Sequence, residues 1–152
     1  MPVQLSVGPP VLTIDQDVTF MVTDLNGEIS PDTEQGVFCA DTRFISRYQV
    51  TANGIPWTHL TSSAIAYNTA RIYLTNQTVP TEEGEIPAGT VSLTITNAIL
   101  RFLLAEDLEV TNHGLKPIQF NLELDLESDF ADLFEVKEHR FVRRGRIDTV
   151  LD

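Results

Sequence analysis

The side chains best suited to chemistry are three carboxylates near the end of the chain, Asp129, Asp132 and Glu135. Two carboxylates at a suitable separation can act as acid and base on a glycosidic bond, and carboxylates also bind sugars and cations. If residues 129–136 form a short helix, Asp129 and Asp132 lie on one face, roughly with Glu135. The plainer interpretation is a solvated helix start, where carboxylates favour the positive end of the helix dipole. We favour the plainer interpretation and expect no catalytic pair here.

A second polar group, Asp41-Thr42-Arg43, stands among aromatic residues just before a predicted strand. The guanidinium of Arg43 can form paired hydrogen bonds with a carboxylate or with sugar hydroxyls. The same geometry suits a structural ion pair, either with Asp41 or with the carboxylates at 129–135. The structural role is the favoured one, and both remain open from the residues alone.

Aromatic rings could supply a platform on which sugar rings stack. Single aromatic residues on strands more often pack in the core or at a sheet edge, so this signal is weak. The candidates are Trp57, Tyr48, Tyr67 and Tyr73.

Other ingredients of an active site are sparse in this sequence. His59, His113 and His139 have no companions at metal-ligand spacing, and zinc sites need several His or Cys ligands. No glycine-rich phosphate loop is present. The lone cysteine, Cys39, fits a small buried hydrophobe better than a nucleophile. We expect no metal, no cofactor and no complete active site in these residues.

The net charge of −12 narrows the choice of partners. Phosphate binding needs an excess of Lys and Arg, so we expect neither nucleic acid nor an anionic membrane surface as a partner. The charge is uneven, because residues 139–146 are basic while 106–135 are strongly acidic. These two segments could lie side by side, or the basic one could meet a partner.

The location is expected to be cytoplasmic. One cysteine cannot form an internal disulfide, which fits a reducing compartment. The first residues lack the basic and apolar regions of a secretory signal, and no apolar run is long enough for a membrane span.

Alternation of apolar and polar residues predicts strands over most of the chain. The clearest case is 117–127, and shorter cases are 18–22, 44–51, 71–75 and 91–96. Residues 100–110 match a helix or a strand, and the surrounding pattern favours the strand.

Turn signals separate these strands. Asn26-Gly27 and Asn53-Gly54 are typical hairpin dipeptides. His113-Gly114 predicts that 110–112 and 118–126 pair as a hairpin, and 80–89 is expected to be an exposed excursion.

One short helix is expected near 129–136, capped by Ser128, with Phe130, Leu133 and Phe134 on one face. Many short strands and almost no helix predict one all-β domain over residues 1–152, a two-sheet antiparallel β-sandwich.

Several segments together are similar to a known family. Residues 36–48, GVFCADTRFISRY, resemble the G-x-F-x-x-D-T-R-F-L-S-x-Y opening of the N-terminal domain of bacterial glycogen debranching enzymes of the amylo-α-1,6-glucosidase type. Asn53-Gly54 follows at the matching place. The blocks that complete the order are 70–76, 86–90, 110–112, 129–136 and 143–145.

The resemblance implies a supersandwich-like β-sandwich that precedes a catalytic (α/α)6 barrel, expected after residue 152. The barrel would carry the carboxylates that hydrolyse α-1,6 branches of glycogen-like α-glucans, and this domain alone is expected to be inactive. Its implied role is to dock the barrel and to contact α-glucan. The residues expected at these contacts are Asp41, Arg43, Tyr48, Arg71, Tyr73, Asp129, Asp132 and Glu135.

Two other functions remain open. The chain could be a stand-alone carbohydrate-binding module, with Trp57 and the tyrosines as its platform. It could also be a non-catalytic β-sandwich for protein interaction.

Overall fold

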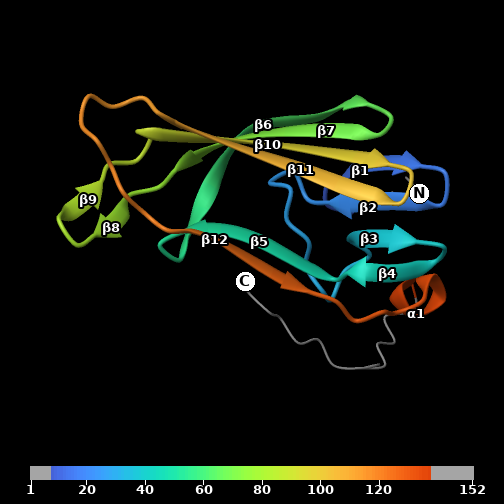
Figure 1. The fold of residues 1–152 in the computed structure, drawn as a ribbon. Coiled ribbons are helices and arrows are strands. Elements are labelled where there is room, and N and C mark those ends of the chain that lie inside the picture. Colours follow the sequence, from blue (N-terminus) through green and yellow to red (C-terminus); the bar gives the residue numbers. More distant parts are fainter. Residues whose placement is uncertain (1–7, 138–152) are drawn as a thin grey trace, which may run out of the picture.

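The computed structural model describes residues 8–137 and shows an all-β architecture (Figure 1). Its strands pair antiparallel in sheets of four, six and two strands, and one short helix follows them. This confirms the predicted antiparallel sandwich with a short helix near 129–136. No helix among these residues combines the length and the apolar character needed to cross a membrane.

The four-stranded sheet is built from consecutive hairpins and has the order β1-β2-β3-β4. The first turn, at Asp17-Val18, places Asp17 in the left-handed region. A long loop from 24 to 35 separates the two hairpins. The strands are β1 (Leu12–Gln16), β2 (Thr19–Thr23), β3 (Gly36–Cys39) and β4 (Thr42–Ile45).

The six-stranded sheet has the order β11-β10-β7-β6-β5-β12 and is curled. Strand β6 causes the curl: its start pairs with β5, the rest pairs with β7, and two register shifts interrupt the ladder. Irregular pairing of this kind bends a strand and increases its twist. The strands are β5 (Arg47–Ala52), β6 (Ile55–Ala66), β7 (Thr69–Asn76), β10 (Val91–Leu100), β11 (Leu103–Asn112) and β12 (Leu122–Glu127).

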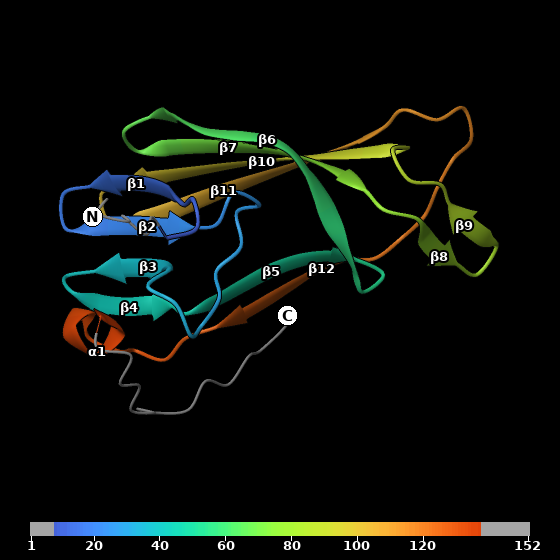
Figure 2. The same cartoon turned by 180° about the vertical axis from the view of Figure 1, so that it is seen from behind.

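The curl makes one sheet supply two layers, one with β7, β10 and β11 and one with β5 and β12 (Figures 1 and 2). The core lies between them. Alternate residues of β10, from Val91 to Ile99, are at most 1 % exposed. Their neighbours on β7 and β5, such as Ile72 and Val50, are buried in the same cluster. Burial of one face of each strand is what the period of two predicted.

The hairpin predicted between 110–112 and 118–126 is wrong. β11 instead pairs along its whole length with β10, from Val91↔Asn112 to Leu100↔Leu103. β12 pairs with β5, where its leucines lie beside Ala52, Val50 and Tyr48. The predicted strand at 117–127 therefore begins only at Leu122, because the residues before it cross from one layer to the other (Figure 1).

The segment 100–110 forms a strand, as favoured, with a turn at Arg101-Phe102. Asn53-Gly54 makes a hairpin between β5 and β6, and both residues have positive φ as the dipeptide predicts. The excursion at 80–89 contains its own small hairpin, β8 (Val79–Thr81) and β9 (Gly84–Ile86).

The helix is shorter than predicted and begins later. It is α1 (Leu133–Lys137). Asp132, not Ser128, caps it, because the Asp132 carboxylate accepts a hydrogen bond from the Glu135 N–H at 2.8 Å. Phe130 has φ of 51° and lies outside the helix, so the predicted apolar face with Leu133 and Phe134 does not form.

Candidate functional site

Arg43, on β4, is the largest fully buried side chain among the described residues. Its Nε donates to Asp129 at 3.1 Å, and one Nη donates to the second oxygen of the same carboxylate. The other Nη donates to the carbonyls of Thr33 and Gln35 at 3.0 and 2.9 Å. A further bond, of 3.1 Å, reaches the carbonyl of Pro31. The guanidinium is thus enclosed by a bidentate carboxylate and three carbonyls of one loop.

Gly36 makes room for this arrangement. A Cβ at this position would lie 2.5 Å from Cδ of Arg43 and 2.9 Å from the backbone oxygen of Ile45. The second contact is with backbone, which cannot move aside cheaply. Any side chain at residue 36 would therefore push Arg43 or β4 out of place.

Backbone hydrogen bonds join the same two segments. The N–H of Arg43 donates to the carbonyl of Ala131, and the N–H of Leu133 donates to the carbonyl of Asp41, both at 2.8 Å. Asp129 also accepts from the N–H of Ala131 at 3.1 Å. The structure therefore brings the two polar groups of the sequence together, with α1 held against β4 by both backbone and side chains.

The predicted site residues at this junction between β4 and α1 differ in how far they are exposed to solvent. Arg43 is inaccessible, and Asp129 is partly covered. Asp132 and Glu135 are half-buried at the start of α1, whereas Asp41 is exposed in the β3–β4 turn. Asp129 and Asp132 each accept local backbone hydrogen bonds, as a capping and turn role requires.

Tyr48 lies in the interior, where a second group of polar side chains, Tyr48, Glu106 and Glu28, connects the two layers. Its hydroxyl donates to the carboxylate of Glu106 on β11. Burial raises the pKa of Glu106, although the bond from Tyr48 acts in the opposite direction. Burial, and then that bond to Glu106, raises the pKa of the Tyr48 hydroxyl well above its usual value. Burial, with a smaller effect of Asp24, raises the pKa of the Glu28 carboxyl to about 7.

Sequence reasoning missed Glu28 and Glu106. A signal for Glu106 was available, since it falls between Leu104 and Leu108 on the inward face of an alternating strand. A carboxyl at an inward position needs a partner in the core. No comparable signal marks Glu28, which lies in an irregular loop.

Arg71 and Tyr73 lie on the opposite, outward face of the six-stranded sheet. Tyr73 is 40 % exposed, and Arg71 Nε donates to the Thr96 hydroxyl at 3.3 Å. Thr94 and Thr61 lie beside Tyr73 on the neighbouring strands. This face therefore offers one accessible ring among hydroxyl groups.

Of the other two aromatic candidates, one is buried and one is exposed. Trp57 is 6 % exposed and packs edge-on against Phe120, with ring centroids 6.1 Å apart. Tyr67, in the β6–β7 turn, is 69 % exposed. Trp57 therefore cannot serve as the platform of a sugar-binding module.

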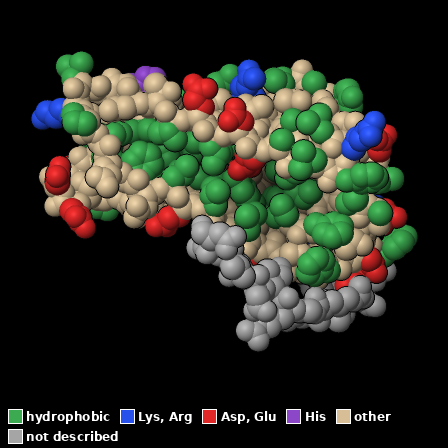
Figure 3. Space-filling model, in the orientation of Figure 1, with side chains coloured by type: hydrophobic (Ala, Val, Ile, Leu, Met, Phe, Trp, Pro, Cys, Tyr) green, Lys and Arg blue, Asp and Glu red, His purple; other side chains and the backbone are tan. Residues whose placement is uncertain are grey.

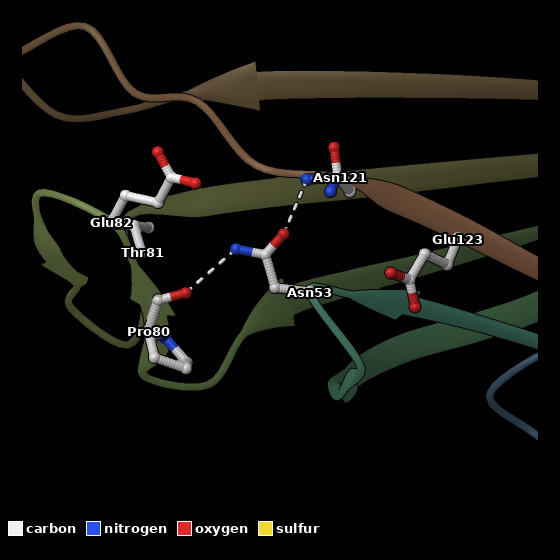
Figure 4. A pocket seen from close by; sticks show the side chains of 6 residues that line it. All are labelled: Asn53, Pro80, Thr81, Glu82, Asn121 and Glu123. Carbon is white, nitrogen blue, oxygen red and sulfur yellow. Dashed lines mark hydrogen bonds between the residues drawn. The ribbon is translucent and has the colours of Figure 1, made fainter.

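A shallow hollow of about 480 Å³ lies between the β5–β6 turn, the β8–β9 hairpin and the start of β12 (Figure 4). Asn53 connects the segments around the hollow. Its side-chain amide donates a hydrogen bond to the carbonyl of Pro80 at 2.9 Å and accepts one from the N–H of Asn121 at 2.8 Å. The carboxylates of Glu82 and Glu123 line the hollow. Since the Asn53 amide is already engaged by backbone groups, its role there is structural.

Within residues 8–137 no three His, Cys, Asp or Glu side chains come together in a way that could hold a metal ion. Cys39 is half-buried, and its sulfur accepts a 3.5 Å hydrogen bond from the Thr19 hydroxyl. In this part of the chain, the polar groups with the most hydrogen bonds join structural elements to one another.

The fold and these contacts define an all-β module with a polar junction between β4 and α1. The family model described as the N-terminal domain of (some) glycogen debranching enzymes matches residues 14–151. The chain belongs to this family, as the sequence resemblance indicated. Comparisons with curated proteins and with solved structures give no match.

The burial of Arg43 predicts a large effect of Asp129→Asn. The substitution leaves a buried guanidinium without its carboxylate, so the free energy of unfolding should fall by about 3 kcal/mol. Urea denaturation measures it. Asp125→Asn is the matched control, because it breaks the exposed 3.0 Å ion pair with Arg47 and should cost less than about 1 kcal/mol. Equal losses in the two variants would contradict a structural role for Arg43.

The raised pKa of Glu28 predicts a stability that declines with rising pH. In the folded chain the carboxyl keeps its proton up to about pH 7, whereas its ordinary pKa is 4.5. Its contribution is therefore full below pH 4.5 and is lost as the pH rises through about 7. Glu28→Gln should flatten the decline in unfolding free energy between these pH values, and the same change at exposed Glu109 should not. Parallel profiles for wild type and Glu28→Gln would refute the assignment.

Proposed function

We propose that this chain is the non-catalytic N-terminal module of a glycogen-debranching α-1,6-glucosidase, and that it docks the catalytic domain of the same protein. The family membership supplies the context. The observation that carries the docking role is an unusually apolar end of the molecule, which we call the apolar end.

Four β-turns and α1 gather at the apolar end (Figures 1 and 2). Backbone hydrogen bonds connect them in series: Ala40 to Val18, Asp15 to Tyr67, and Ile99 to Asn68. Large apolar side chains at this end are at least half exposed. They are Val18, Tyr67, Leu100, Phe102, Leu103 and Phe134.

Turns are normally polar, and exposed apolar side chains that gather in one region mark an interaction surface. Phe102 is 79 % and Phe134 74 % exposed, and each extends from a different element. A surface built from several turns is held rigidly by the sheets behind it. It suits a lasting contact with another domain better than a transient one.

The predicted contact residues fit this proposal in two roles. Asp41, Asp132 and Glu135 lie at the apolar end and would form part of the polar rim of the contact. Arg43 and Asp129 lie beneath them and would position α1, and therefore Phe134, toward the catalytic domain. The catalytic carboxylates would belong to that domain, which the resemblance describes as an (α/α)6 barrel.

A contact with α-glucan is a second candidate function. It is favoured by the outward face around Tyr73, where an accessible ring lies among threonine hydroxyls. Aromatic rings and hydroxyls in such an arrangement suit a sugar chain, with Arg71 at the edge to donate hydrogen bonds.

The docking proposal predicts that Phe102→Glu with Phe134→Glu weakens the domain contact in the full-length enzyme. Carboxylates in an apolar interface are costly, so the junction between the domains should become accessible to limited proteolysis, and branch-hydrolysing activity should fall at least about tenfold. Leu115→Glu is the control, because Leu115 is fully exposed in the loop at the opposite end. Unchanged proteolysis and activity in the double variant would contradict docking through this end.

The glucan proposal predicts that Tyr73→Ala strongly reduces the retardation of the 152-residue chain by glycogen in affinity electrophoresis. Loss of one stacking ring should weaken binding by about tenfold. Tyr67→Ala, at the apolar end, should leave the retardation unchanged. If the wild-type chain is not retarded at all, the outward face does not bind glucan.

A further inference from the structure

Strand β12 is an edge of the six-stranded sheet. Among residues 8–137 it pairs only with β5, in a regular register from Leu122↔Ala52 to Glu127↔Arg47. Every second backbone amide and carbonyl of β12 therefore points away from the sheet. An uncovered, regular edge of this kind is a template for another strand.

The inner face of β12 is only partly covered. Leu124 and Leu126 lie opposite Val50 and Tyr48, which are buried, yet the two leucines are 48 % and 54 % exposed. Hydrophobic side chains gather in a band between the layer with β10 and β11 and the layer with β12 (Figure 3). A neighbouring strand with one apolar face would cover these leucines.

The outer face of β12 carries a row of carboxylates, Glu123, Asp125 and Glu127. Within residues 8–137, Asp125 is the one member of this row that forms an ion pair, with Arg47 on β5. Neither β12 nor β11, the opposite edge of the same sheet, contains Lys or Arg. A neighbouring strand with a basic face would neutralise this row.

The chain itself contains such a segment. Four of its ten Lys and Arg residues lie within 140–146, outside the described residues. In an extended conformation, Arg140, Arg144 and Arg146 would fall on one face. Phe141, Ile147 and Leu151 would fall on the other. Within 140–147 the exceptions to this division are Val142 and Arg143. Outside that stretch, the arginine face also carries Glu138, Asp148, Val150 and Asp152.

We propose that residues 138–152 pair with the free edge of β12 as an additional antiparallel strand. The arginine face lies beside Glu123, Asp125 and Glu127, and the apolar face covers Leu124 and Leu126. Charge then matches at Arg140, Arg144 and Arg146, hydropathy matches at Phe141 and Ile147, and the pairing gives the edge amides of β12 their partners.

The path of the chain permits this pairing. α1 ends at Lys137, only ten residues after β12 ends at Glu127. The fifteen residues that follow could extend about 50 Å, whereas a six-residue strand spans about 20 Å. A return along β12 from its Glu127 end is antiparallel, as the edge requires.

A second copy of the chain fits the same edge poorly. Two β12 strands side by side would place two rows of carboxylates against each other, and like charges on facing strands are destabilising. Charge complementarity therefore selects the basic segment of the same chain.

The test is amide hydrogen exchange, followed by NMR, on the complete 152-residue chain. The outward-pointing amides of β12 should be protected, with cross-strand nuclear Overhauser effects to residues 140–151. Arg140→Glu, Arg144→Glu and Arg146→Glu together should reduce this protection about tenfold or more. Adding Glu123→Arg and Glu127→Arg should restore it. The control is Arg101→Glu with Lys116→Glu, which changes exposed basic residues elsewhere and should have no effect on β12.

Three results would overturn the proposal. The first is equal exchange of the β12 amides in wild type and the triple variant. The second is the absence of cross-strand effects to residues 140–151. The third is protection that increases with protein concentration, which would identify a second copy as the occupant.

Discussion

The structure depends on a buried guanidinium. Arg43 lies in the interior with hydrogen bonds to both oxygens of Asp129 and to the carbonyls of Pro31, Thr33 and Gln35. Removing a charge from water is expensive, so such a group is retained only if its surroundings satisfy it. The loop before β3, the turn after it and the segment before α1 must all be in place at once. One side chain thus ties together parts of the chain that are 86 residues apart in sequence.

This constraint explains how a short helix can belong to a fixed surface. A helix of five residues has little stability of its own. Here the β4–Ala131 hydrogen bond, the Asp129 carboxylate and the packing of Val136 and Ala131 on Phe38 hold it in place. The exposed Phe134 is therefore presented in a defined position beside the β-turns. Docking through the apolar end requires that rigidity, because ordering a flexible segment on binding would cost affinity.

Much of the fold could be predicted from local patterns. Alternation along β10 and β5 marked strands with one buried face, and Asn53-Gly54 marked a hairpin through its tolerance of positive φ. The partner of β12 could not be predicted, because the sequence around His113-Gly114 has the local features of a hairpin. Pairing with β5 is decided by long-range packing of leucines on Val50 and Tyr48, which no local pattern records.

The candidate site was predictable in its members but not in its environment. Arg43 and Asp129 stood out as polar residues among aromatic ones, and a structural ion pair between their two groups was one open interpretation. Their burial depends on Gly36 and on three loop carbonyls, which become neighbours only in the folded chain. Glu28 could not be predicted either, because its raised pKa results from burial in an irregular loop, and that burial exists only in the folded chain.

The central claim is that Arg43 and Asp129 act as one structural unit beneath the apolar end. A double-mutant cycle of Arg43→Met and Asp129→Leu, followed by urea denaturation, measures their coupling directly. A buried unit should give a coupling energy of about 2 kcal/mol or more, with the double variant more stable than either single variant. A coupling energy near zero, with the two losses adding, would contradict the claim.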